Sequence, residues 1–159
     1  MKPVVSLGDQ FPWDQLIESI DWSLLNAQGR TDAFHEEQPM RETWEQISSI
    51  WPSQYTVSRL KQETGWDRVE GMHCDSHMAC IKQHLGVDVD PAQVTRYWIA
   101  LQDWKPGHSL TIGDEVIYNW KAGDVYSWDN RTPHRGDNVG PHVRYLLMLT
   151  KYTPNENTP

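Results

Sequence analysis

The chain has 159 residues, with 22 acidic and 14 basic side chains and a formal net charge of -8. This length fits one domain with a substantial core, and the acidic balance argues against a protein that binds a nucleic-acid backbone through clustered Lys and Arg. The sequence has no run of roughly 20 apolar residues that could span a membrane, and its N-terminal apolar run is too short for a signal peptide. Cys74 and Cys80 form no recognisable disulfide framework. We therefore expect a soluble, cytoplasmic protein with no nucleic-acid or membrane partner.

Residues 1–52 are expected to be helical. Pro12 suits a first helical turn, and the apolar residues after it recur at steps of three and four, which predicts one buried stripe ending near Gly29. The stripe consists of Trp13, Leu16, Ile17, Ile20 and Leu24. A second helix is expected over residues 41–50, and it ends there because Pro52 prevents its continuation. The segment between the two helices is expected to be a loop.

Residues 53–152 change to short β-branched and aromatic runs separated by turn residues. Strands are expected at 55–60, 69–75, 94–102, 110–112, 116–120, 124–128 and 143–152. Gly113-Asp114 indicates a hairpin, residues 135–141 indicate a turn, and residues 153–159 form a tail. The expected architecture is mainly β: a single domain, 1–159, built as an antiparallel sandwich or barrel with the N-terminal helices packed outside.

The strongest chemical feature begins with His73-Cys74-Asp75. Side chains alternate in an extended segment, so His73 and Asp75 share one side and Cys74 faces the other. A strand and a turn then deliver His134, and two histidines with one carboxylate form the triad that holds Fe(II) with open coordination positions. His77 is an alternative to one of these ligands if the strand continues past Asp75, but not if residues 76–86 turn into a helix or loop.

Arg144 lies inside an otherwise apolar run. A buried charge needs a partner, and this partner is either an acidic side chain in a structural bridge or a ligand carboxylate held through a bidentate fork. His142 shares a strand face with Arg144, so it either lines the same pocket or is a surface imidazole. We interpret His35, His84 and His108 as structural or exposed, and Trp104, Trp120 and Trp128 as core or rim packing.

The order His73-x-Asp75, His134 and then Arg144 ten positions later resembles the Fe(II)- and 2-oxoglutarate-dependent oxygenases. Within that superfamily, the segments that run from Arg96-Tyr-Trp-Ile-Ala-Leu to Arg144 are similar to the aspartyl/asparaginyl β-hydroxylase and proline hydroxylase-like branch. The resemblance covers about residues 71–152. It implies a double-stranded β-helix, a jelly-roll or cupin-like barrel with iron at its mouth.

The resemblance also implies roles for single residues. His73, Asp75 and His134 would be the catalytic metal ligands, although the β-hydroxylase branch often lacks the acidic one. Arg144 would pair with the distal carboxylate of 2-oxoglutarate. Arg96 would help hold the carboxylate nearer the metal, with Trp98 beside the cosubstrate where the branch has a histidine.

The implied activity is that of a dioxygenase that uses Fe(II), 2-oxoglutarate and O₂ to hydroxylate an amino-acid or peptidyl substrate and releases succinate and CO₂. The alternative is a cupin-like metal- or ligand-binding protein without oxygenase activity. A cupin expects H-x-H followed by a glutamate, whereas here Asp75 follows His73 and the next glutamate is Glu115. A cupin also gives Arg144 no role.

Overall fold

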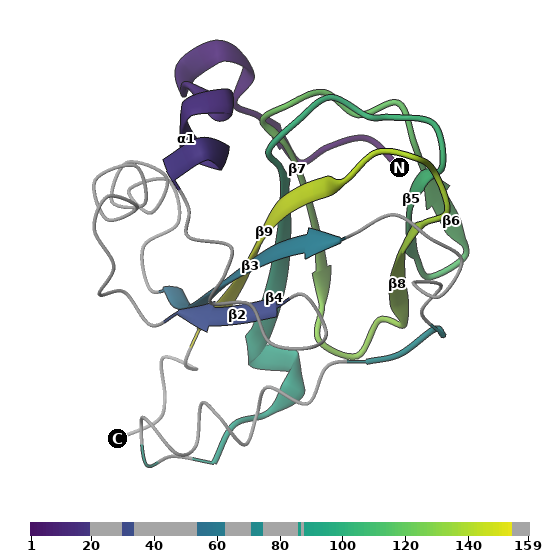
Figure 1. Ribbon diagram of the computed structural model, residues 1–159. Helices are drawn as coiled ribbons and strands as arrows, with labels where there is room; N and C mark the ends of the chain where they lie inside the picture. The colour runs from purple at the N-terminus through teal and green to yellow at the C-terminus, as the bar shows by residue number, and fades with distance from the viewer. Residues whose placement is uncertain (20–29, 34–53, 63–70, 75–85, 87, 154–159) are drawn as a thin grey trace.

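The fold is described from a computed structural model, which covers residues 1–19, 30–33, 54–62, 71–74, 86 and 88–153. Within these residues the protein is mainly β, as the sequence predicts, and its strands form two antiparallel sheets (Figure 1). The larger sheet has the order β1-β7-β4-β9-β3-β2 and the smaller has the order β6-β5-β8. The larger sheet contains β1 (Val5–Ser6), β2 (Arg30–Ala33), β3 (Gln54–Gln62), β4 (Val94–Ala100), β7 (Asp124–Asp129) and β9 (Arg144–Tyr152). The smaller contains β5 (His108–Ile112), β6 (Glu115–Ile117) and β8 (His134–Asn138).

The two sheets face each other across an aromatic core. Alternation along β4 and β7 directs every second side chain to this interior, and the residues found there come from both sheets. They are Trp98, Ala100, Leu110, Ile112, Ile117, Trp120, Tyr126, Trp128, Leu146 and Met148. Trp98 packs edge-on against Trp120, with ring centroids 4.9 Å apart. Trp98, Trp120 and Trp128 therefore fill part of the space between the sheets.

The outer face of the larger sheet is covered by the N-terminal segment. The helix α1 (Trp13–Ser19), at the upper left of Figure 1, follows the short 3-10 helix η1 (Gly8–Gln10). A second 3-10 helix, η4 (Pro91–Gln93), leads directly into β4. Trp13 and Leu16 of α1 belong to a second core cluster with Ile99, Val125 and Leu147 of the sheet. The prediction that the first helical stripe packs outside the barrel is confirmed for these residues.

Truncating this contact is expected to destabilise the domain. Leu16 is 5% exposed, so Leu16→Ala removes packed methyl groups and should lower the free energy of unfolding by about 2–5 kcal/mol. Urea denaturation followed by circular dichroism measures the loss. Gln15→Ala changes an exposed neighbour on the same helix and should leave stability within about 0.5 kcal/mol. Equal effects of the two variants would show that α1 does not pack through Leu16.

Most of the predicted strands are present with small changes in their ends. The hairpin at Gly113-Asp114 is confirmed, since Ile112 of β5 pairs with Glu115 of β6 across the two-residue turn. Gly113 adopts a φ of 59°, which a residue with a Cβ rarely tolerates. β6 stops at Ile117, earlier than predicted, and the expected strand at 69–75 is represented in the described residues by a single bridge between His73 and His134.

Three strands were not predicted. Residues 135–141 were expected to be a turn, but β8 occupies Arg135 to Asn138, because its five residues pair with β5 from His108 to Ile112. β2 lies in the segment expected to be a loop, where it pairs with β3, and β1 pairs with β7. In each case pairing with a distant strand overrides a weak local preference. The second predicted helix, the end of the first near Gly29 and most of the tail lie outside the described residues.

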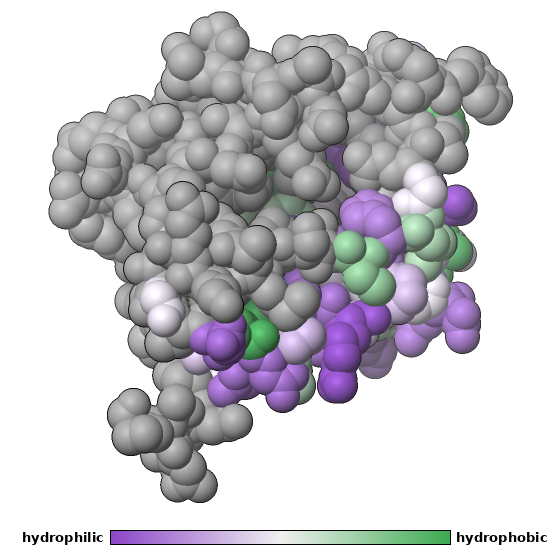
Figure 2. Space-filling model, turned by 90° about the horizontal axis from the view of Figure 1, so that it is seen from below, coloured by the Kyte–Doolittle hydropathy of each residue, from purple (hydrophilic) through white to green (hydrophobic). Residues whose placement is uncertain are grey.

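None of the helices in the described part of the chain has the length and apolar character that a membrane crossing requires. Figure 2 shows one face on which the coloured residues are mostly hydrophilic, with separate hydrophobic spots between them. Exposed large apolar side chains within the described residues include Met72, Val116 and Tyr118.

Candidate metal and ligand site

His73 and His134 lie side by side, although 60 residues separate them in the sequence. Their backbones form an antiparallel bridge in which each N–H donates to the other residue's carbonyl, at 3.0 Å from His73 and 2.9 Å from His134. The two ring centroids are 4.7 Å apart. Directly opposed residues of an antiparallel pair send their side chains to the same face. The backbone therefore brings two of the three predicted metal ligands together.

The hydrogen bonds of the two rings suit metal binding. Nδ1 of His73 lies 2.9 Å from the Gly71 carbonyl, and Nδ1 of His134 lies 3.1 Å from the Thr132 carbonyl. A carbonyl only accepts, so each Nδ1 must donate, which places the lone pair of a neutral ring on Nε2. Metal-bound histidines use their other nitrogen in this way. Both rings are thus fixed in the tautomer that presents Nε2 as a ligand.

The third predicted ligand, Asp75, lies outside the described residues, as does His77. Among the residues that the structure describes, no cluster of three His, Cys, Asp or Glu side chains could hold a metal ion. Cys74 is exposed, and its thiol donates to the Arg131 carbonyl at 3.3 Å. The described ligand set is therefore the histidine pair.

Arg144 is buried between the sheets, with 4% of its surface exposed. Its Nη1 donates to the Ser109 carbonyl of β5 at 2.6 Å. A Cβ built on Gly136 of β8 would lie 2.3 Å from Nη2, so the guanidinium rests on the space that this glycine leaves open. His134 and Gly136 face the same side of β8 and are about 6.7 Å apart along the strand. The guanidinium therefore lies one two-residue step further along β8 than His134.

Arg96 and Trp98 also face the interior from β4, and both are 2% exposed. Nη1 of Arg96 donates to the Thr150 hydroxyl. Trp98 contacts the rings of Trp120 and Tyr126, which are packing contacts. A role for either residue beside a cosubstrate stays a prediction.

Trp128 is a residue of this site that the sequence alone did not assign to it. Its ring centroid lies 4.8 Å from that of His134, so the contact helps to fix the orientation of the imidazole. We interpreted Trp128 from the sequence as packing, and it does belong to the interior core. Trp128 lies only six residues before His134 in the sequence, which was a possible sign of a shared site. Because a turn separates the two residues, the sequence alone did not predict that their rings meet.

His108 lies at the end of the β5–β8 ladder away from His134, where it pairs with Asn138, and it is 2% exposed. Its Nε2 donates to the His142 carbonyl at 2.8 Å, and Asn138 Nδ2 donates to the same carbonyl at 2.7 Å. Burial lowers the pKa of His108, and nearby cationic groups, Arg144 first among them, lower it further against the raising effect of this hydrogen bond. The side chain of His142 is exposed, so the surface interpretation of this residue is the one the structure supports.

The lowered pKa of His108 predicts a loss of stability in acid. The unfolded chain takes up a proton near pH 6.5 that the folded protein binds only at lower pH. Stability from this residue is therefore complete above pH 6.5 and falls as the pH drops below it, by at most about 1.4 kcal/mol per pH unit. Urea denaturation from pH 5 to 8 measures the slope. His108→Gln should show a shallower slope, and an unchanged slope would contradict the assignment.

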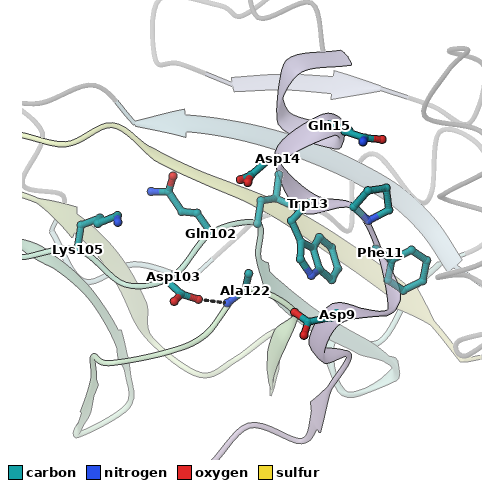
Figure 3. Close-up of a pocket in the computed structure, with 11 residues that line it drawn as sticks. Asp9, Phe11, Trp13, Asp14, Gln15, Gln102, Asp103, Lys105 and Ala122 are labelled. Carbon is teal, nitrogen blue, oxygen red and sulfur yellow. Dashed lines mark hydrogen bonds between the residues drawn. The ribbon is translucent and has the colours of Figure 1, made fainter.

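A separate pocket of about 560 Å³ lies outside the barrel (Figure 3). It is bounded by residues 11–15 at the start of α1 and by the segment after β4, and it includes the carboxylates of Asp9, Asp14 and Asp103. Ala122 N–H donates to Asp103 at 3.0 Å, and this bond lowers the pKa of that carboxyl. Leu101, Phe11 and Trp13 belong to the outer core, so the pocket lies on the opposite face of the sheet from His134.

No protein-family model matches the chain, and no curated protein matches it either. Solved structures do match. A non-heme monooxygenase, the ThoJ–Ni complex, is 14% identical, with a TM-score of 0.64 over 96% of this chain and 73% of that one. SnoK, a non-heme α-ketoglutarate-dependent carbocyclase from nogalamycin biosynthesis, is 14% identical, with a TM-score of 0.67 over 95% and 78%. EvdMO1 is 16% identical, with a TM-score of 0.61, and this chain covers 46% of it.

The fold is a double-stranded β-helix. This confirms the architecture that the sequence resemblance implied. At identities of 14–16% the likeness establishes the fold alone. The specific branch of β-hydroxylases and proline hydroxylases stays a prediction from the sequence, and function has to be argued from the site.

Proposed function

We propose that the protein is an Fe(II)- and 2-oxoglutarate-dependent dioxygenase that hydroxylates an amino-acid or peptidyl substrate. The observation that carries the proposal is the pair His73 and His134, whose rings lie 4.7 Å apart with both Nδ1 atoms facing backbone carbonyls. The fold that this chain shares with ThoJ, a non-heme monooxygenase, and SnoK, an α-ketoglutarate-dependent enzyme, supports it. The substrate class comes from the sequence resemblance.

The donor set fits Fe(II). Two neutral imidazoles offer Nε2, and Asp75, two residues after His73, would supply the carboxylate of a facial triad. When bound, Fe(II) with 2-oxoglutarate and O₂ supplies the oxidative decarboxylation and the hydroxylation of a C–H bond. The chain's own residues hold the ligands and orient them.

Arg144 would orient the cosubstrate. A guanidinium presents a planar fork of donors that suits a carboxylate, and this one lies against Gly136, two residues along β8 from His134. A dicarboxylate with one end beside the histidines would direct its other end toward Arg144. Arg144 is itself 4% exposed, so little water reaches the guanidinium, and the low polarity of the interior would strengthen the interaction between the two charges.

The test is turnover of 2-oxoglutarate by the full chain. Incubation with Fe(II), ascorbate and O₂ should convert 2-oxoglutarate into succinate, and addition of the substrate from a panel of free amino acids and peptides should increase the rate. Omission of Fe(II), or its replacement by Zn(II), should abolish succinate formation. Fe(II) bound in one equivalent without succinate formation across the whole panel would instead favour the cupin-like binding protein, for which a buried Arg144 has no assigned role.

A further inference from the structure

The indole N–H of Trp128 is a buried donor without an acceptor. The residue is 5% exposed, and its Nε1 atom is inaccessible to solvent and has no hydrogen-bond partner in the part of the chain that the structure describes. Buried polar groups are almost always paired, and leaving one unpaired costs about 1–3 kcal/mol. An orphan donor therefore indicates an acceptor that the described residues do not supply, and a bound ligand would provide one.

The position of Trp128 shows where that acceptor would be. Trp128 on β7 is directly opposite Arg96 on β4, and Arg96 is directly opposite Thr150 on β9. The three side chains form one row across the interior face of the larger sheet. The ring of His134 approaches this row from the smaller sheet, at 4.8 Å from Trp128. The donor thus belongs to the layer of the barrel that contains the histidine pair.

The indole N–H of Trp128 and the positive charge of Arg96 together favour a ligand with an anionic oxygen. An indole N–H only donates, so its partner must be an acceptor and cannot be an ammonium group. Arg96 is permanently charged and lies in the adjacent position, where directly opposed Cβ atoms are about 4.5–5.5 Å apart. A carboxylate oxygen satisfies both conditions, because it accepts the hydrogen bond and carries the opposite charge.

We propose that the Trp128 indole N–H donates a hydrogen bond to a carboxylate bound beside His73 and His134, at a position separate from Arg144. The inference rests on the proposed function, since it places the subsite at the metal. The carboxylate belongs either to 2-oxoglutarate, at the end nearer the metal, or to an amino-acid substrate. Trp128 positions the cosubstrate in the first case and contributes to substrate specificity in the second.

The experiment observes the donor directly. In ¹⁵N-labelled protein loaded with Zn(II), which is diamagnetic and does not support turnover, each indole N–H gives its own NMR signal, and Trp128→Phe identifies the signal of Trp128. Addition of 2-oxoglutarate should shift this signal downfield and slow its exchange with solvent. If the shift appears only when an amino acid is added to that complex, the carboxylate belongs to the substrate.

Affinity provides a second readout. Trp128→Phe keeps the aromatic ring and loses the N–H, so it should weaken binding of the identified carboxylate ligand to the Zn(II) protein by about 10-fold or more in calorimetry. Trp120→Phe is the matched control, because Trp120 is a core residue of the same cluster, 2% exposed, and its replacement should leave that affinity unchanged. Circular dichroism confirms that both variants are folded.

The outcomes separate this inference from the proposed function. If the wild-type protein binds 2-oxoglutarate and the amino acid while the Trp128 signal stays in place and Trp128→Phe binds equally well, the subsite is wrong and the oxygenase proposal stands. If acetate shifts the Trp128 signal in a protein that forms no succinate, the carboxylate subsite stands and the oxygenase proposal falls.

Discussion

Replacing His134 with alanine is expected to weaken Fe(II) binding by at least about 100-fold and to abolish succinate formation. Loss of a group that only orients a metal ligand costs about 10- to 100-fold in metal affinity, so loss of a ligand itself should cost more. His134 is 5% exposed and its backbone is paired with that of His73. Solvent therefore has little access to this position to replace the lost imidazole as a metal ligand. Calorimetry with Mn(II) and the succinate assay measure the two effects.

The matched control is His142→Ala. The side chain of His142 is exposed, and its carbonyl, which the substitution retains, is the group that His108 and Asn138 use. Metal affinity and turnover should therefore stay within about twofold of the wild type. Asp75→Ala tests the third ligand in the same assays. Wild-type metal affinity in both His134→Ala and Asp75→Ala would overturn the metal site.

Removing the guanidinium of Arg144 is expected to raise the KM for 2-oxoglutarate at least about 30-fold. Truncation of one partner in a buried, hydrogen-bonded charge pair costs about 2–5 kcal/mol, and 2 kcal/mol corresponds to about 30-fold in affinity. Arg144→Met keeps most of the apolar stem, which limits the loss of packing. Steady-state kinetics with varied 2-oxoglutarate measures the change, and metal affinity should stay at the wild-type value.

Gly136→Ala tests the position of the guanidinium and leaves its charge in place. The new Cβ would lie 2.3 Å from Nη2 of Arg144, so the end of this flexible side chain must move, and the KM for 2-oxoglutarate should rise while Fe(II) still binds. Arg135→Met is the control, because Arg135 is on the other face of β8, where it pairs with Asp137 at 3.2 Å. An unchanged KM in both Arg144→Met and Gly136→Ala would exclude Arg144 from the cosubstrate site.

The sequence predicted those elements whose local signals agree with their final environment. β4 is rich in β-branched and aromatic residues, and its burial alternates over its first five positions. The hairpin is indicated by Gly113-Asp114, whose turn chemistry acts within four residues. The helical stripe with Trp13 and Leu16 was equally clear. The candidate ligands His73 and His134 and the arginine ten residues later were selected from residue types and spacing, with the family resemblance supplying their roles.

β8 shows why local signals fail elsewhere. Its sequence, His-Arg-Gly-Asp-Asn, contains three residues that are depleted in strands. It becomes a strand because β5 supplies its hydrogen-bonding partners, and its glycine is required by the guanidinium that lies against it. Neither partner is adjacent to β8 in the sequence.

What the sequence determined by itself is the mainly β character of the chain, most of the strand positions and the residue types of a candidate site for a metal and a carboxylate. The tertiary structure decided which of these residues meet: His73 with His134 through a backbone bridge, Arg144 with Gly136 across the two sheets, and Trp128 with His134. The physical reason is that periodicity and turn chemistry act over a few neighbouring residues, whereas each of these contacts is made by pairing and packing of separate strands.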